Sequence, residues 1–221
     1  MFRRIVALSM LTILLPLVGC VSTKNVKADM GMLRSDQPAT VTVSARKKPD
    51  FGAMTAGKAA FGLIGAAAMI KAGNDIVEEN GVEDPAAYIG AELAKSLTES
   101  LGVQYVENGG KLAESGEAGD LAKVYDNAHL LLDVQTINWS FVYFPTDWNS
   151  YRVIYSAKLR LVDTRTGKLQ AEGFCARVPE KSAGSPSRDQ LLADHAALLK
   201  SELKVAADYC IGQFKANVLG A

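Results

Sequence analysis

Residues 150–178, SYRVIYSAKLRLVDTRTGKLQAEGFCARV, alternate apolar and polar side chains on either side of a short turn. This alternation predicts two antiparallel strands, each with one buried and one solvated face. The connecting residues TRTGK suit a tight hairpin in which Thr164 pairs with Lys168 and Gly167 takes the left-handed conformation. On the buried face of the first strand we expect Tyr151, Val153, Tyr155, Ala157, Leu159 and Leu161.

The predicted register agrees with the chemistry of both faces of this hairpin. It places Ala157 opposite Cys175 on the apolar face, and Arg160 opposite Glu172 on the solvated face. Opposite charges that face each other across a strand pair stabilise a sheet. One register therefore satisfies both the packing and the charges.

The remaining elements follow from periodicity and capping residues. Asp84 and Pro85 begin a helix that ends at Gly102, and Ser187 with Gln190 forms a capping box at the start of a long C-terminal helix. The other elements are strands at 40–45, 103–107 and 129–144, a helix within 58–73 and a short helix at 120–127. Together they predict an α+β fold: a two-layer domain with a mainly antiparallel sheet and a C-terminal meander, covered by helices that include the long C-terminal one.

Two cysteines are predicted to lie on surfaces that pack together. Cys175 is on the buried face of the last strand, and Cys210 belongs to the apolar stripe of the C-terminal helix. That stripe runs through Leu192, Leu199, Leu203, Ala206, Cys210 and Phe214. An even pair in an oxidising compartment favours a disulfide, and two buried thiols are the alternative. We predict the disulfide, which requires that the helix pack across the sheet.

The N-terminal residues MFRRIVALSMLTILLPLVGC have the features of a processing signal. Two arginines form a positive n-region, and residues 5–17 form an apolar h-region too short for a stable membrane span. The sequence LVGC at its end looks like a bacterial lipobox, so we predict cleavage before Cys20 and acylation of that cysteine, which anchors the chain to a membrane. An ordinary signal with a chance cysteine is the alternative. Because Val21 rather than aspartate follows, resemblance to enterobacterial sorting rules favours the periplasmic face of the outer membrane.

The predicted mature chain divides into a tether and one domain. Residues 1–19 form the signal, residues 20–40 are polar without periodicity and predict a flexible tether, and residues 41–221 form a single periplasmic domain. The whole chain has a formal net charge of zero, and loss of the two arginines of the signal leaves a charge of −2. This balance gives no electrostatic footprint for nucleic acid, so no nucleic-acid partner is expected.

Residues 58–73, KAAFGLIGAAAMIKAG, are apolar or small between two lysines. The uncharged residues 59–70 would make about 18 Å of helix, which is short of the roughly 30 Å core of a bilayer. Residues 52–58 match G-x-x-x-x-G-K, but Ala59 stands where a nucleotide loop needs Ser or Thr, so no nucleotide is expected. We predict a helix that packs inside this domain or under its tether; self-association and shallow membrane contact are the alternatives.

No pattern of catalytic or metal-ligating residues stands out. His129 and His195 have no ligand spacing, and the two cysteines of the domain are better used on each other, so we expect neither a metal nor another cofactor. The patterns of a nucleophile elbow, a zinc protease and a dinucleotide site are absent from the sequence. We therefore expect no enzyme.

Aromatic residues gather around the predicted tip of the long hairpin, the segment PTDWNS at 145–150. Phe144 and Trp148 stand beside or within this predicted loop, where aromatic side chains are hard to bury. Together with Tyr143 and Tyr151 they predict a partner-binding surface. The alternative is that the aromatic residues at alternating strand positions belong to the core.

The hairpin sequence LRLVDTRTGKLQAEG at 159–173 resembles the corresponding hairpin of CsgG-type, LpoB-type and TolB amino-terminal domains. The order of elements from Thr40 to Ala216 is also similar, and residues 141–181 resemble a group of uncharacterised proteobacterial lipoproteins. The resemblance implies a periplasmic α+β fold. Relatives of this kind include secretion-channel subunits, activators of cell-wall synthases and transport auxiliaries.

The sequence therefore predicts an outer-membrane-anchored periplasmic lipoprotein that acts as a protein-interaction or assembly module of the cell envelope. An envelope enzyme of the hydrolase kind and a transport auxiliary that carries a ligand are the alternatives. A pocket with converging polar groups and a perturbed acid or base would favour the enzyme, and a flat aromatic patch would favour the binding module.

Overall fold

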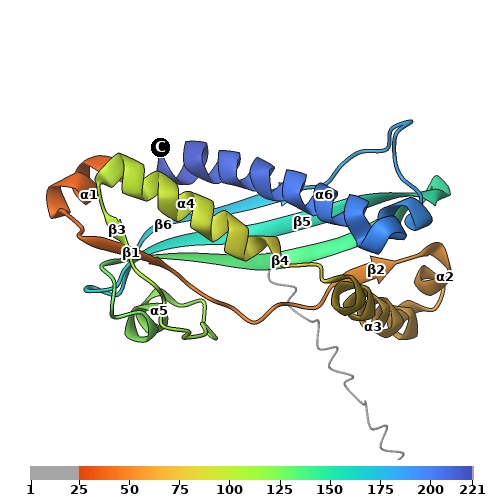
Figure 1. The fold of residues 1–221 in the computed structure, drawn as a ribbon, viewed down its shortest axis with the longest axis horizontal. Helices are drawn as coiled ribbons and strands as arrows, with labels where there is room; N and C mark the ends of the chain where they lie inside the picture. Colours follow the sequence, from red (N-terminus) through yellow and green to blue (C-terminus); the bar gives the residue numbers. More distant parts are fainter. Residues whose placement is uncertain (1–24, 221) are drawn as a thin grey trace, which may run out of the picture.

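The structure, a computed structural model, describes residues 25–220. The predicted signal at 1–19 and the predicted acylation site Cys20 lie outside this range. The helices α4 (Pro85–Leu101) and α6 (Arg188–Phe214) lie along one face of an open sheet, and the short helix α5 (Ala118–Val124) lies on the other face (Figure 1). The sheet is mainly antiparallel, so the predicted α+β fold is confirmed.

The sheet is built around a meander of three long strands. These are β4 (Leu130–Phe144), β5 (Asp147–Asp163) and β6 (Lys168–Arg177). Three shorter strands extend it: β1 (Thr40–Val43), β2 (Gly52–Met54) and β3 (Gln104–Tyr105). Both β1 and β2 pair in parallel with successive parts of β4, and β3 pairs with β1, which gives the order β3-β1-β4-β5-β6.

The hairpin of β5 and β6 has the predicted register over most of its length. Ala157 lies opposite Cys175, and Arg160 lies opposite Glu172. The register shifts by one residue beyond Leu161, next to the turn. The alternation of the sequence therefore predicts the pairing wherever both strands follow a regular pleat.

The predicted pair of Thr164 with Lys168 is wrong, because Asp163 takes that place opposite Lys168. Thr164 instead donates its backbone N–H to the carbonyl oxygen of His129, at 3.0 Å. Thr164 therefore bonds to the residue that precedes β4 and not to β6. Gly167 has a φ of 67°, the left-handed conformation that the turn predicts.

The capping box at the start of α6 is present, but the helix is interrupted soon afterwards. The Ser187 hydroxyl accepts from the Gln190 N–H at 3.2 Å, and the Gln190 side chain accepts from the Ser187 N–H at 2.8 Å. Residues 193–196 leave the helical conformation. This break changes the phase of the apolar stripe, so Leu191 is buried where Leu192 was expected. After the break, Leu199, Leu203, Ala206, Cys210 and Phe214 are buried as predicted.

The stripe of α6 packs across the inner face of the sheet and brings the two cysteines together. Cys175 and Cys210 form a disulfide, with their Cα atoms 5.5 Å apart. Both belong to the main hydrophobic core, which also contains Trp139 and Tyr155. The Trp139 indole N–H donates to the carbonyl oxygens of Pro49 and Asp50, so this large side chain is buried without an unpaired donor.

The N-terminal segment differs from the predicted flexible tether, because residues 25–39 lie against the domain. Val26 exchanges backbone hydrogen bonds with Glu172 at 2.7 and 2.9 Å, and α1 (Met30–Asp36) buries Leu33. Ala28 is buried as well. So few buried apolar side chains make no periodic pattern, which is why the sequence does not reveal the packing.

The segment 58–73 is helical, but its outer face is not covered. It divides into α2 (Ala56–Ala59) and α3 (Gly62–Asn80). On the inner face Gly65 and Gly73 allow close approach of the backbone. A Cβ at Gly65 would lie 1.8 Å from the carbonyl oxygen of Lys58, and a Cβ at Gly73 would lie 1.8 Å from that of Phe51. On the outer face Phe61, Leu63 and Ile64 are 69%, 91% and 79% exposed, so the predicted burial inside the domain is wrong for this face.

The polar face of β5, which the alternation predicts to be solvated, is partly buried. Asp133 is completely buried, and Arg160 is buried beside it. The Asp133 carboxylate accepts two hydrogen bonds from Arg46 at 2.7 and 2.8 Å, one from Arg160 at 2.8 Å and one from the Ser44 hydroxyl at 2.6 Å. This cluster lies on the face that carries α5.

Candidate functional site

The hairpin that connects β4 and β5 is tighter than predicted, and this changes which aromatic residues are exposed. β4 continues to Phe144 and β5 starts at Asp147, so the expected loop is mostly strand. Phe144 is buried under the Arg152 guanidinium, which lies 5.2 Å from its ring centre. Tyr151 is buried edge-on against Phe141, at a ring separation of 5.7 Å.

The four predicted contact residues therefore do not form one exposed patch. Phe144 and Tyr151 belong to the interior, and Tyr143 is only partly exposed. Trp148 alone among them is freely accessible, at 65% of its surface. Phe144 and Tyr151 are buried because the strands continue through the expected loop, and a strand turns alternate side chains inward.

Hydrogen bonds and an ion pair of the neighbouring Asp147 order the backbone around Trp148. The Asp147 carboxylate accepts from the Ser150 hydroxyl at 2.7 Å and from the Asn149 N–H at 3.2 Å, and it pairs with Lys181 at 3.0 Å. These contacts, led by the Ser150 hydroxyl, lower the pKa of Asp147 to about 2. The carboxylate is therefore charged throughout the neutral range, and Trp148 is presented by an ordered tip.

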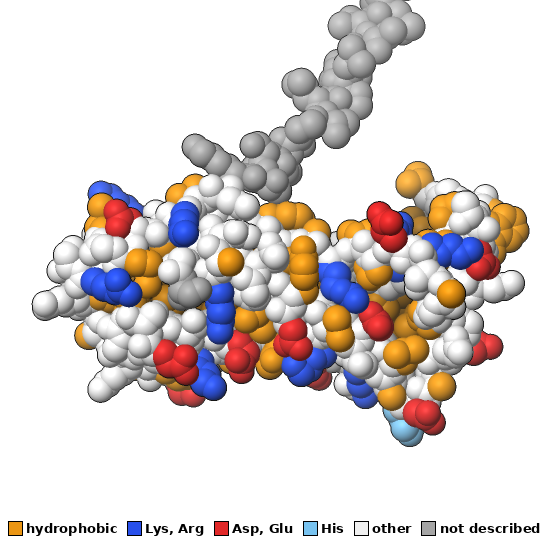
Figure 2. Space-filling view, turned by 90° about the horizontal axis from the view of Figure 1, so that it is seen from above, with side chains coloured by type: hydrophobic (Ala, Val, Ile, Leu, Met, Phe, Trp, Pro, Cys, Tyr) orange, Lys and Arg blue, Asp and Glu red, His pale blue; other side chains and the backbone are white. Residues whose placement is uncertain are grey.

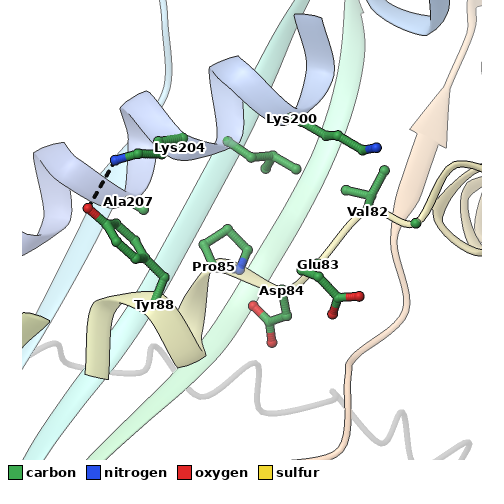
Figure 3. Close-up of a pocket in the computed structure, with 10 residues that line it drawn as sticks. Val82, Glu83, Asp84, Pro85, Tyr88, Lys200, Lys204 and Ala207 are labelled. Carbon is green, nitrogen blue, oxygen red and sulfur yellow. Dashed lines mark hydrogen bonds between the residues drawn. The ribbon is translucent and has the colours of Figure 1, made fainter. Parts of the chain in front are cut away.

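A pocket of about 300 Å³ opens between the start of α4 and the middle of α6 (Figure 3). Its apolar lining is Val82, Pro85, Leu203 and Ala207, and its polar lining is Glu83, Asp84, Tyr88, Lys200 and Lys204. Lys204 donates to the Tyr88 hydroxyl at 2.9 Å and pairs with Asp208 at 2.9 Å. Glu83 pairs with Lys48 at 2.9 Å. These pairs leave the pocket with an apolar floor and a rim on which Glu83 and Lys204 are paired with other charges.

Asp84 is the acidic residue of this pocket whose pKa is shifted. Its carboxylate accepts from the Ala86 N–H at 3.0 Å and from the Thr136 hydroxyl, which in turn accepts from the Tyr155 hydroxyl at 3.0 Å. Burial raises the pKa of Asp84, and the hydrogen bonds from Thr136 and Ala86 oppose that rise. Burial also raises the pKa of Tyr155, which stays neutral and can donate. These contacts make Asp84 the N-cap of α4 and the end of a buried hydrogen-bond chain.

We expect Asp84→Asn to raise the free energy of unfolding at neutral pH, because asparagine keeps the cap without a partly buried charge. The folded-state pKa of Asp84 lies above its unfolded value, so the penalty is present above the folded pKa and disappears as the pH falls through it. Urea unfolding at pH 7 and near pH 4 measures this, and the two proteins should converge at the lower pH. Asp84→Ala, the control without a cap, should lose about 1 kcal/mol. A difference between wild type and Asp84→Asn that is the same at both pH values would contradict the assignment.

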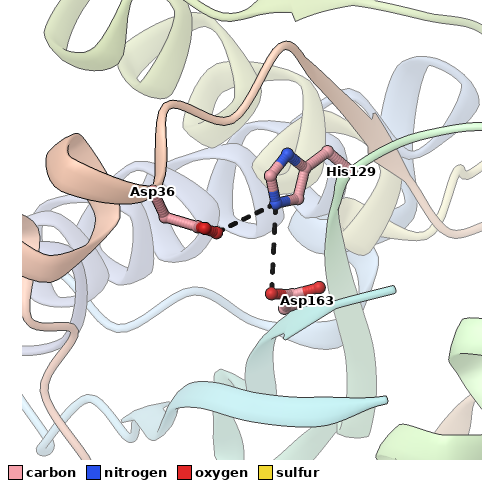
Figure 4. Close-up of side chains that lie close together, drawn as sticks. All are labelled: Asp36, His129 and Asp163. Atoms are coloured by element: carbon pink, nitrogen blue, oxygen red, sulfur yellow. Dashed lines mark hydrogen bonds and ion pairs between the residues drawn. The ribbon is translucent and has the colours of Figure 1, made fainter. Parts of the chain in front are cut away.

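A cluster of potential ligand atoms lies at the far end of the sheet, where α1 meets the turn after β5 (Figure 4). His129 Nε2 lies 3.1 Å from Asp36 Oδ2 and 3.9 Å from Asp163 Oδ2. No ligand role is expected for His129 from its sequence context, and the wide separation of the three residues along the chain gives no spacing that could reveal the cluster.

The cation beside these carboxylates is Arg165. Its guanidinium lies 2.6 Å from Asp36 Oδ2 and 3.9 Å from Asp163 Oδ2. This hydrogen bond is the main cause that lowers the pKa of Asp36, and His129 adds to it. The other oxygen of Asp163 accepts from the N–H groups of Arg165 and Thr166. The arrangement works as an ion-pair cluster that fastens α1 to the sheet.

This chain is only weakly similar to known proteins. No protein-family model matches the chain, and no curated protein matches it in sequence. The lipoprotein GNA1162 from Neisseria meningitidis is 15% identical over 81% of this chain and 99% of that chain, with a TM-score of 0.31. The PelC dodecamer from Paraburkholderia phytofirmans is 12% identical over 77% of this chain and 86% of that chain, with a TM-score of 0.30.

The C-terminal domain of LpoB from Escherichia coli is also similar in part. It is 14% identical over 68% of this chain and 96% of that chain, with a TM-score of 0.21. Scores this low identify no shared function. Within residues 25–220, none of the helices combines the length and the hydropathy needed to cross a bilayer.

Proposed function

We propose that the chain is a lipoprotein of the outer membrane, anchored through acylated Cys20, whose periplasmic domain binds a protein partner or assembles with itself. The observation that carries the proposal is Trp148, a large and exposed aromatic side chain on an ordered hairpin tip. Binding energy at interfaces concentrates in a few aromatic or arginine anchors. An anchor that is already ordered loses less conformational entropy on binding.

The anchoring rests on the lipobox-like sequence at residues 17–20. Acyl chains on Cys20 would hold the domain at the periplasmic face of the membrane, where its partners are other envelope proteins.

Two other functions have weaker support. An envelope enzyme would need an acid or base in a pocket, and Asp84 has a raised pKa beside the α4–α6 pocket. However, the helix cap and the bond to Thr136 give that carboxylate a structural role. A transport auxiliary would use the pocket for a ligand, but most of the polar groups on its rim already pair with one another or with neighbours.

Trp148→Ala should remove crosslinks to the partner in intact cells and weaken binding by about 2 kcal/mol or more, while the free energy of unfolding changes by less than about 0.5 kcal/mol. The reason is that an exposed anchor makes few contacts in the free domain. Crosslinking with mass spectrometry measures the first effect, and thermal unfolding measures the second.

Two controls make this experiment decisive. Tyr209→Ala removes another exposed aromatic side chain, on α6, and should leave the crosslinks intact. Trp139→Ala removes a core tryptophan and should cost about 3–5 kcal/mol of stability. Crosslinks that survive Trp148→Ala would place the contact surface elsewhere, and a large loss of stability would show that Trp148 packs in the core.

A further inference from the structure

The connection between α2 and α3 and the first turns of α3 carry a group of exposed apolar side chains. They are Phe61, Leu63, Ile64, Ala67 and Ala68, and we call this group the apolar tip. Adjacent large apolar side chains with this exposure mark a binding surface rather than the scattered apolar residues of an ordinary surface. The tip lies at the same end of the molecule as the β4–β5 hairpin (Figure 1).

The exposure of the tip does not come from a loosely attached helix. Lys58 donates to the carbonyl oxygen of Ala53 at 3.1 Å, and the Phe51 N–H donates to the Asn74 side chain at 2.9 Å. Ile76 and Val77 are buried on the inner face of α3. Because the inner face is packed in this way, α3 cannot rotate about its axis to bury the apolar tip.

Polarity along α3 changes in a definite order. The tip carries no charge, Lys71 follows it, and Asp75, Glu78 and Glu79 come after that. At about 1.5 Å per residue, the first of these acids lies about 16 Å beyond Ile64 along the axis. Lys71 Nζ pairs with Asp75 at 2.8 Å, so the acid nearest the tip is also neutralised.

This order, with apolar side chains first, the neutral Lys71–Asp75 pair next and further acids last, matches the depth profile of a membrane interface. Apolar side chains enter the boundary of the acyl chains, cations lie among the headgroups, and acids stay in the water. The face over α4 and α6 differs, because charges of both signs are mixed there with hydrophobic side chains (Figure 2).

We propose that the apolar tip inserts into the interface of the membrane that holds the lipid anchor. A protein partner would have to supply a pocket for Leu63, whereas a fluid bilayer accommodates a protruding side chain of any shape. The nearness of the domain to this membrane rests on the proposed anchoring, because the segment from Cys20 to Asn25, where the chain joins β6, spans at most about 18 Å. The lipid anchor and the apolar tip are then two independent attachments to the same membrane, and the second one restricts the orientation of the domain on it.

The test places an environment-sensitive fluorophore on the mature full chain. Leu63→Cys carries the label in the tip, and Glu79→Cys carries it at an exposed position on the charged part of the same helix. Since Cys175 and Cys210 are joined and Cys20 is proposed to be acylated, the new cysteine is the single free thiol, which mass spectrometry checks together with the acyl mass. The probe membranes are vesicles of phosphatidylethanolamine and phosphatidylglycerol, with and without nitroxide-labelled lipids.

We expect the label at residue 63 to shift its emission to shorter wavelength in vesicles and to be quenched by nitroxide lipids at a depth of about 5–10 Å below the headgroups. The label at residue 79 should keep an aqueous spectrum. An aqueous spectrum at residue 63 would overturn the inference. A shift without nitroxide quenching would also overturn it, because the tip would then be buried against protein, such as a second copy. Failure of the partner contact is measured separately by the Trp148 crosslinks, and failure of anchoring by the mass of Cys20.

Discussion

Asp133→Ala is expected to lower the free energy of unfolding by about 3–5 kcal/mol, because it removes the nearest counter-charge of Arg46 and Arg160 in a buried site. The other carboxylate near Arg160, that of Glu172, is 3.8 Å away, too far for a hydrogen bond. Arg46 places two guanidinium nitrogens, and Arg160 places one, within 2.8 Å of the carboxylate oxygens. The side chain of Asp133 is completely buried. Removal of one partner of such a cluster exposes the full desolvation cost of the charges that remain.

Urea unfolding of wild type and variant measures the effect, and Asp75→Ala is the matched control. Asp75 pairs with Lys71 at 2.8 Å, but both side chains are exposed, so its loss should cost only about 0.3–0.5 kcal/mol. Asp133→Asn keeps the size of the side chain and should fall between the two. A loss below about 1 kcal/mol for Asp133→Ala would mean that water reaches the arginines and replaces the carboxylate.

The strands and helices that could be predicted from the sequence are those in which a local pattern and the tertiary environment agree. The alternation in β5 coincides with burial against α6, and Asp84 and Ser187 are caps whose partners lie within three residues. Such interactions are contained in a short window, so one sequence is enough to find them. The break in α6 at residues 193–196 is not encoded by proline or glycine, and nothing local predicts it.

The candidate sites were harder to predict because they depend on contacts between distant segments. Phe144 looks like a loop residue in the sequence, but Arg152 from the next strand covers its ring. Asp36, His129 and Asp163 meet only because α1 folds back onto the sheet. The sequence shows that residues 59–70 are apolar. Which of their side chains are exposed depends on which face of α3 packs against β2 and Lys58, and that is a tertiary contact.

Removal of the disulfide is expected to be the other large effect. The variant with both Cys175→Ala and Cys210→Ala should lose about 3–4 kcal/mol of stability, the chain-entropy value for a loop of this length. The two residues are 35 positions apart in sequence, and the crosslink joins β6 to α6. Alanine is the suitable replacement because both side chains are buried, and a serine would bring an unpaired hydroxyl into the core.

The entropic origin of this loss can be separated from a simple packing defect. Removal of a crosslink lets the unfolded chain expand, so the dependence of the unfolding free energy on urea should become steeper. A cavity in the core would lower the midpoint without that change in slope. Reduction of the wild-type protein by dithiothreitol supplies the control. It breaks the S–S bond and opens the loop, but it removes no atoms from either side chain. If the reduced protein unfolds with the same free energy and slope as the oxidised one, the crosslink does not constrain the unfolded state, and the noncovalent packing of α4 and α6 on the sheet holds the two layers together.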